Sequence, residues 1–287
     1  MRQVPVALIK KAPQHIAFLH IPKAGGMTLR HILKRQYEAD ALFEIGEDIN
    51  GDIERFRTAP VTERRRTKLL MGHMTHGLHR FLPGTVTCLT MLRDPVSRVY
   101  SEYRFLSSNE NHSLYSTIAP LTYHQYLELD PTRQAGNGQT RLLSGSTYGN
   151  HIGVPGIEPM NEAHLNRALD HLKRDYPLVG LLERFDETLM LWQEQCNWGY
   201  PFYEKKNISK RPSRALDASE IEHTRSKNRF DLVLYQEALK LFDANLKKQS
   251  NSFHRRLKTF TLLNKTYRQS KHYGRKVKQK LQTARQR

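Results

Sequence analysis

The chain is organised around one stretch, His20-Ile21-Pro22-Lys23-Ala24-Gly25-Gly26-Met27-Thr28-Leu29. It follows the apolar run 16–19, which predicts a strand, and leads into residues 30–35, which predict a helix. A strand, a glycine turn and a helix N-terminus together suit a phosphate-like anion, because the glycines admit backbone N–H groups and Lys23 adds a positive charge. An ordinary tight turn is the alternative. The stretch is not a GxxxxGK[ST] nucleotide loop, since Lys23 precedes the glycines.

A second anion-binding pattern follows the clearest predicted strand, residues 85–92. It reads Arg93-Asp94-Pro95-Val96-Ser97-Arg98-Val99-Tyr100-Ser101-Glu102-Tyr103, with Pro95 in the first turn of a predicted helix. Arg93 at the strand end and Ser101 on the helix can hold a phosphate by charge-assisted and hydroxyl hydrogen bonds. The alternative is a helix cap with Arg93 and Asp94 as a surface ion pair. Two anion-binding patterns after neighbouring strands indicate a nucleotide with phosphates at both its 5′ and 3′ positions.

Strands and helices alternate along most of the chain. Further strands are predicted at 41–45, 68–71 and 178–182, and helices at 75–82, 122–129, 161–174, 186–196 and 220–247. Residues 107–120 are predicted to be an irregular polar loop. This alternation favours an α/β fold with a parallel sheet, whose ligands bind at the carboxyl ends of the strands. The glycine loop, His73 and Arg93 each follow a predicted strand, so we expect them to converge on one cleft.

The two stretches resemble the 5′-phosphosulfate loop and the 3′-phosphate motif of sulfotransferases, especially the branch of the heparan sulfate 2-O-sulfotransferases and their bacterial relatives. The resemblance spans roughly residues 15–245. Further matches are Gly72-His73 with Gly77-Leu78-His79, Asn137-x-Gln139-Thr140-Arg141-x-Leu143, Val179-Gly180-Leu181-Leu182-Glu183-Arg184-Phe185-Asp186, Asp231-x-x-Leu234-Tyr235 and the basic loop Asn207-Ile208-Ser209-Lys210-Arg211-Pro212.

The resemblance implies a three-layer P-loop-like fold, with a central, mostly parallel sheet flanked by helices. It also implies the donor 3′-phosphoadenosine-5′-phosphosulfate (PAPS) and a hydroxyl acceptor, with a carbohydrate expected. The residues expected to bind the donor are Pro22, Lys23, Ala24, Gly25, Gly26, Met27, Thr28, Arg93, Ser101 and Arg211. Relatives often carry threonine or a small residue where this chain has Ala24 and Met27, so the hydroxyl contact would come from Thr28.

Two of these side chains are expected to take part in the transfer itself. Lys23 would stabilise charge on the transferring group and the leaving oxygen, so no metal is required. His73 occupies the family's position for the catalytic base, and histidine titrates near neutral pH. His76 and His79 are the reserve candidates for the base. Asn137, Gln139 and Arg141 would line the acceptor side or serve a purely structural role.

The basic charge is concentrated at the C-terminal end. Residues 244–287 hold 14 of the 46 Lys and Arg and no Asp or Glu, which leaves the other 243 residues with a net charge of only +4. We therefore expect a sulfotransferase domain over residues 1–246 and a basic, partly helical or disordered tail over 247–287. The tail could contact an anionic membrane or a polyanionic glycan. Nucleic acid is not an expected specific partner.

The remaining composition is that of a globular protein. No apolar run is long enough to span a bilayer and no secretory signal is visible, so a complete chain of this sequence is expected to be cytoplasmic. The two cysteines form no CxxC or Cys/His pattern, and thus give no zinc motif. Two other functions stay open: a nucleotide-dependent kinase, which would need a magnesium site that the sequence does not display, and a basic nucleic-acid-binding protein that uses the tail.

Overall fold

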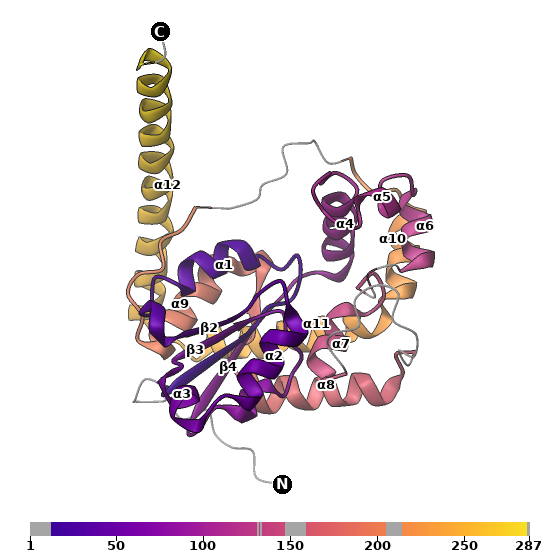
Figure 1. Cartoon of the computed structure of the whole chain (residues 1–287), viewed down its shortest axis with the longest axis horizontal. Helices are drawn as coiled ribbons and strands as arrows, with labels where there is room; N and C mark the ends of the chain where they lie inside the picture. Colours follow the sequence, from indigo (N-terminus) through magenta and orange to yellow (C-terminus); the bar gives the residue numbers. More distant parts are fainter. Residues whose placement is uncertain (1–12, 131, 133, 147–158, 205–213, 286–287) are drawn as a thin grey trace.

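A five-stranded parallel sheet lies at the centre of the computed structural model, which describes residues 13–130, 132, 134–146, 159–204 and 214–285 (Figure 1). Its strand order is β2-β3-β1-β4-β5, and every neighbouring pair is parallel. The predicted α/β fold with a parallel sheet is therefore confirmed. The strands are β1 (His15–Leu19), β2 (Leu42–Ile45), β3 (Leu69–Gly72), β4 (Val86–Leu92) and β5 (Gly180–Leu181).

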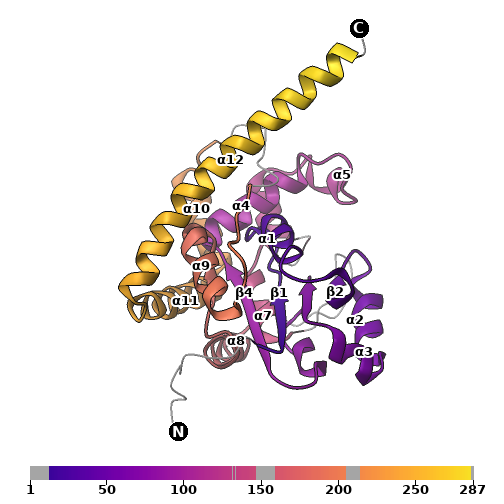
Figure 2. The ribbon, with the colours of Figure 1, turned by 90° about the vertical axis from the view of Figure 1, so that its left-hand side faces the viewer.

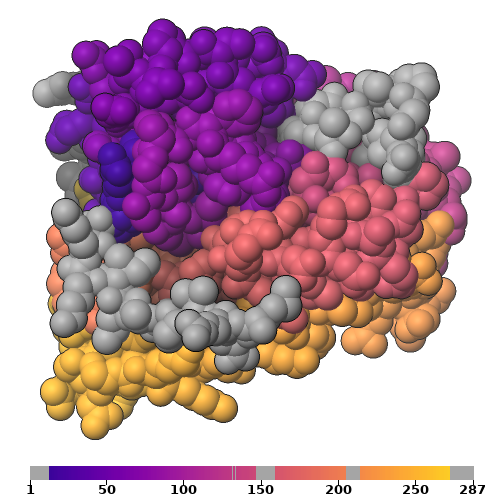
Figure 3. Space-filling view, turned by 90° about the horizontal axis from the view of Figure 1, so that it is seen from below, coloured from indigo at the N-terminus to yellow at the C-terminus, as the bar shows by residue number. Residues whose placement is uncertain are grey.

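Helices cover both faces of the sheet, as expected for a parallel sheet whose strands are apolar on both sides. In Figure 1, α1 (Gly26–Leu33) and α9 (Phe185–Cys196) lie on one side and α8 (Glu162–Asp175) lies on the other. Phe18 of β1 meets Trp192 of α9 edge to face, with 6.0 Å between ring centroids. In the view from below, purple atoms of the N-terminal third lie against the rose-coloured atoms of α8 (Figure 3).

A group of helices beside the sheet has its own small core. This core is formed by α4 (Pro95–Leu106), α5 (Tyr115–Ile118) and α6 (Tyr123–Leu129), and α10 (Ala218–Lys227) packs against α4 and α6. The region 107–120, predicted as an irregular loop, thus includes the short helix α5. The remaining elements are η1 (Ala39–Ala41), α2 (Ile49–Thr58), α3 (Val61–Arg66), η2 (Leu78–Phe81), α7 (Gly138–Ser144) and η3 (Leu182–Arg184).

The single helix predicted over residues 220–247 is wrong. The structure divides it into α10 and α11 (Arg229–Lys247), with Asn228 between them. The Asn228 amide donates to the carbonyl oxygens of Ala135 and Thr224, and its side-chain oxygen accepts from the Asn137 N–H. These tertiary hydrogen bonds fix the break, and hydrophobic periodicity does not register them.

The basic C-terminal segment forms one helix, α12 (Asn251–Arg285). Phe253, Phe260 and Asn264 have no exposed surface, and the Asn264 side chain accepts from the Tyr203 N–H at 2.9 Å. The first turns of α12 are therefore packed into the main core, whereas its C-terminal part projects away from the rest of the chain (Figures 1 and 2). Among the described residues, no helix is long and apolar enough to cross a membrane.

Candidate functional site

The glycine loop joins the buried central strand β1 to α1. Lys23 and Gly25 both have left-handed backbone conformations, with φ of 65° and 81°, and Gly25 precedes the first turn of the helix. A Cβ atom on Gly25 would lie 2.8 Å from the side chain of Leu182. The left-handed conformation and this close contact both favour glycine at the position. α1 has no side-chain cap and no acidic residue in its first turn. Its N-terminal N–H groups and partial positive charge thus suit an anion.

One histidine lies against this loop and a second lies against the first. The His20 ring fills the space beside Gly26, where an added Cβ would lie 1.5 Å from Nε2. His73, directly after β3, stacks on His20 with ring centroids 4.3 Å apart. Burial, followed by the charge of His73 and then of Lys23, lowers the pKa of His20 well below its usual value. His20 is therefore a neutral spacer between the loop and His73, the expected base.

Lys23 and Arg93 bring two cations to the same place. The Lys23 ammonium lies 3.9 Å from the ring centroid of Phe105, and the Arg93 guanidinium donates to the Lys23 carbonyl oxygen at 3.0 Å. Burial lowers the pKa of Lys23 to about 8; Glu102 raises it and Arg93 lowers it further. Burial also lowers the pKa of Arg93. Both cations are poorly solvated and lie beside a helix N-terminus, so a bound anion would stabilise their charged forms.

Ser101 lies on the side of α4 that faces the loop. It is four residues before Phe105, so both side chains project from the same side of the helix, and Phe105 contacts Lys23. The helix begins at Pro95, and the Asp94 carboxylate accepts from the Ser97 N–H. Asp94 is thus a helix cap, as the alternative interpretation of this motif held.

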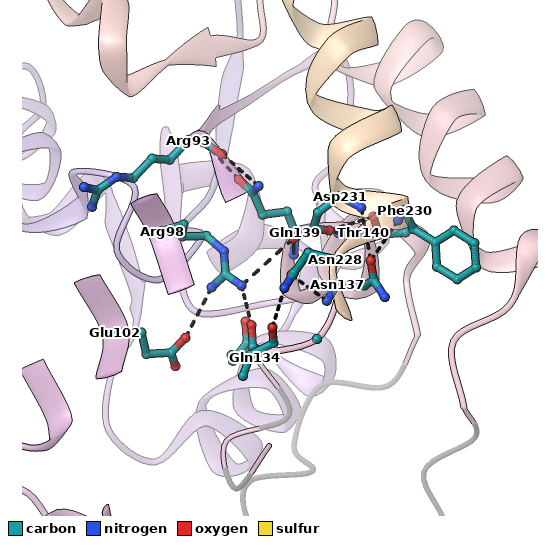
Figure 4. A network of polar contacts seen from close by, with 12 residues as sticks. Arg93, Arg98, Glu102, Gln134, Asn137, Gln139, Thr140, Asn228, Phe230 and Asp231 are labelled. Atoms are coloured by element: carbon teal, nitrogen blue, oxygen red, sulfur yellow. Dashed lines mark hydrogen bonds and ion pairs between the residues drawn. The ribbon is translucent and has the colours of Figure 1, made fainter. Parts of the chain in front are cut away.

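A polar network fixes the backbone of Arg93 (Figure 4). The Gln139 amide accepts from the Arg93 N–H at 3.0 Å and donates to the Arg93 carbonyl oxygen at 2.9 Å. Asp231 in turn accepts from the Gln139 N–H and from the N–H and hydroxyl of Thr140. Asp231 has no exposed surface, and it lies 4.0 Å from the guanidinium of Arg98. The network therefore ties the end of β4 to α7 and α11.

Arg98 belongs to this support rather than to the anion site. It is fully buried and donates to Glu102, one turn along α4, and to the carbonyl oxygen of Gln134. Burial raises the pKa of Glu102, and the opposing charges of Arg98 and Lys23 lower it. The pair therefore holds α4 against the chain at Gln134.

The later motifs support the site. Asn137 accepts from the N–H groups of Phe230 and Asp231 and thereby caps α11. Glu183 accepts from the Asp94 N–H and from the Tyr235 hydroxyl, both at 2.9 Å. Of the two interpretations for residues 137–141, these contacts favour the structural one for Asn137, as those of Gln139 do.

Several other residues that the sequence predicted for the site are buried, are exposed to solvent or lie in another part of the molecule. Thr28 is 7% exposed and Met27 is 39% exposed. Arg211 lies outside the described residues. His76 and His79, the reserve bases, lie in a separate cluster with Asp175 of α8. Burial lowers the pKa of both histidines, that of His76 to about 3.

The sequence reasoning did not single out three residues of the site. His20 lay inside the quoted stretch, but its contact with Gly26 depends on the course of the loop. Phe105 could have been found from its four-residue spacing from Ser101. Glu183 lay in a recognised motif, although nothing in that motif indicated a contact with the α4 N-terminus.

One comparison with known proteins identifies a relative. A segment of 89 residues is 33% identical to a protein-tyrosine sulfotransferase of Arabidopsis thaliana, and it covers 31% of this chain and 16% of that protein. No family model matches the chain. The local similarity is to a sulfotransferase in general, so the heparan sulfate 2-O branch stays a prediction.

Proposed function

We propose that this protein is a PAPS-dependent sulfotransferase that acts on a hydroxyl group. The observation that carries the proposal is the pair Lys23 and Arg93, two partly buried cations at the uncapped N-terminus of α1. The local similarity to a sulfotransferase supports the same class.

The residues of the loop fit the donor's charge. The 5′ end of PAPS is anionic, and it would meet the Lys23 ammonium and the N–H groups of residues 24–28. Arg93 and Ser101 would hold the 3′-phosphate, with Arg211 as a further predicted contact. An anion here would offset the burial that lowers the pKa of both Lys23 and Arg93.

The proposed transfer assigns one duty to each reacting side chain. The acceptor oxygen attacks the sulfur of the donor, the bond from sulfur to the phosphate oxygen breaks, and adenosine 3′,5′-bisphosphate leaves. Lys23 stabilises negative charge on the leaving oxygen, and His73 takes the proton of the acceptor hydroxyl. His20, stacked on His73 and against Gly26, sets the position of that ring relative to the loop.

The acceptor has two candidates. The resemblance of the two donor motifs favours a carbohydrate hydroxyl, whereas the relative's printed name favours the phenol of a tyrosine. Both need the same base and the same donor site, so the donor chemistry does not separate them. A transfer assay with labelled PAPS over glycans and tyrosine-containing peptides decides which accepts the label.

Variants test the two roles. Lys23→Ala and His73→Ala are each expected to lower transfer at least a hundredfold. Lys34→Ala is the matched control for the lysine, because Lys34 lies at the other end of α1 and pairs with Glu44. His31→Ala, an exposed position on the same helix, is the control for the histidine. Full activity in either test variant would contradict its assigned role.

Ligand protection separates this proposal from the two other functions. Adenosine 3′,5′-bisphosphate should raise the melting temperature, and ATP with Mg²⁺ should raise it less. The opposite order would favour a kinase. Salt-sensitive binding of nucleic acid that disappears when the basic residues after Lys271 are removed, while the buried part of α12 is kept, would favour the nucleic-acid-binding alternative.

A further inference from the structure

A cluster of metal-ligating side chains lies on the face of the sheet covered by α8, outside the proposed donor site. His76 and His79 are three residues apart in the connection that follows β3 and enters η2, and His171 and Asp175 are four residues apart at the end of α8. The four-residue spacing places His171 and Asp175 on one side of the helix. These two segments are about 95 residues apart in sequence, and their side chains are in contact.

Three of these residues converge. One ligand atom each from His76, His79 and Asp175 lies within 4.8 Å of the other two. Nε2 of His76 lies 3.2 Å from a carboxylate oxygen of Asp175. His76 is 6% exposed, and its Nε2 makes no hydrogen bond to any residue that the structure describes. This buried nitrogen therefore points into the cluster, where it lies close to the Asp175 carboxylate without the alignment of a hydrogen bond.

Contacts at Nδ1 hold the rings of His76 and His171 in place. Nδ1 of His171 lies 2.7 Å from the Leu143 carbonyl oxygen, so it carries the proton and leaves Nε2 as a lone-pair donor. Nδ1 of His76 lies 3.4 Å from the Tyr176 hydroxyl. Metal-bound histidines typically use the second nitrogen in this way, which fixes the tautomer and the ring. The rings of His76 and His171 stack with centroids 3.7 Å apart.

We propose that His76, His79 and Asp175 bind a divalent transition metal of the zinc class, with the fourth position taken by water. Imidazole nitrogen and carboxylate oxygen are the donors that Zn²⁺ accepts in a four-coordinate site. Arg174 donates to both oxygens of Asp175. Its side chain is 59% exposed, so it can move and leave one carboxylate oxygen to bind the metal. No sequence motif indicates the site, because its ligands come from two distant segments.

The metal would tie the connection after β3 to the end of α8. His76 is three residues after His73, so this tie would restrain the segment that also carries the expected base. The metal has no part in the proposed transfer, and its binding is measured without any sulfate donor. Failure of one proposal therefore leaves the other intact.

The experiment is a titration of the full, chelator-treated chain with Zn²⁺ against a competing chromophoric chelator. One tightly bound equivalent per chain is expected, and Co²⁺ should give the visible spectrum of a four-coordinate nitrogen–oxygen site. His79→Gln and Asp175→Asn alter partly exposed side chains, and each should weaken Zn²⁺ binding at least about tenfold. His254→Gln, on the exposed surface of α12, should bind as the unaltered chain does.

Three results would overturn the proposal. The unaltered chain could take up no Zn²⁺, or His79→Gln and Asp175→Asn could both bind it as tightly as the unaltered chain. A loss of affinity of equal size in His254→Gln would mean that surface histidines hold the metal. Circular dichroism shows whether each variant is folded. The cobalt spectrum is recorded on the unaltered chain, so it tests the site even if a variant does not fold.

Discussion

The affinity of this protein for adenosine 3′,5′-bisphosphate should fall as the pH rises through about 8. Burial lowers the pKa of Lys23 from 10.5 to about 8 in the free protein, so its charge is lost well below the usual pH for a lysine. Only the ammonium form attracts the anion, and binding to the neutral form therefore requires uptake of a proton. The affinity for adenosine 3′,5′-bisphosphate is therefore highest below this pKa and declines above it.

The size of the effect follows from that value. About nine in ten Lys23 side chains are protonated at about pH 7, and about one in eleven at about pH 9. If only the ammonium form binds, the Kd should rise about tenfold over this interval, which corresponds to about 1.4 kcal/mol. The phosphates of the ligand are already ionised throughout this range.

Isothermal titration calorimetry at several pH values and constant ionic strength measures the change. Lys23→Arg is the matched variant, because the guanidinium stays charged throughout and can also stack on Phe105. Its Kd should be nearly constant between the two pH values. A constant Kd in the unaltered chain, or an equal rise in the arginine variant, would refute the assignment of the charge to Lys23.

Three further substitutions test the packing around the site and the tail. Gly26→Ala should cost about 1–3 kcal/mol in the free energy of unfolding, because its Cβ would meet Nε2 of His20, and the same change should cost much less when made in a His20→Ala variant; urea unfolding of the two single variants and the double variant decides. Asp231→Ala leaves two buried N–H groups and a hydroxyl without their acceptor and should lower the free energy of unfolding by about 3–5 kcal/mol in the same measurement. The stability of Asp231→Asn should lie between those of the unaltered chain and Asp231→Ala, and a loss below about 1 kcal/mol in Asp231→Ala would contradict the network. Phe260→Ala should lower stability by about 3–5 kcal/mol, whereas Leu262→Ala, at a position 68% exposed, should change it by less than about 0.5; equal melting temperatures would show that α12 is not part of the core.

The fold was largely predictable because its signals are local. Buried parallel strands are short apolar runs, and each was visible as such in the sequence; β1 and β4 were predicted to within a residue at either end. The turn at Gly25 was also predictable, because its left-handed backbone conformation favours glycine, whereas the same conformation at Lys23 was not. The break at Asn228 was not, since it depends on hydrogen bonds to Ala135 and Asn137, about 90 residues away.

The candidate site was predictable in its cations but not in their surroundings. Lys23 and Arg93 were expected to converge because both follow strands of one parallel sheet, and the carbonyl contact between them agrees with this. The sequence did not reveal that Phe105 covers the ammonium or that Gln139 brackets the Arg93 backbone. Both contacts come from side chains on elements whose orientation is decided by packing, and the spacing of Phe105 from Ser101 was the one sequence signal for either.

The burial of Phe253 and Phe260 has a consequence for how the chain folds during synthesis. The last strand of the sheet ends at Leu181, about 80 residues before Phe260. At roughly 5–20 residues per second, a ribosome needs about 4–16 s to make the intervening chain. During that interval the sheet can form, but the apolar surface that receives α12 stays open to water. That surface is where we expect a nascent-chain chaperone to bind until α12 displaces it.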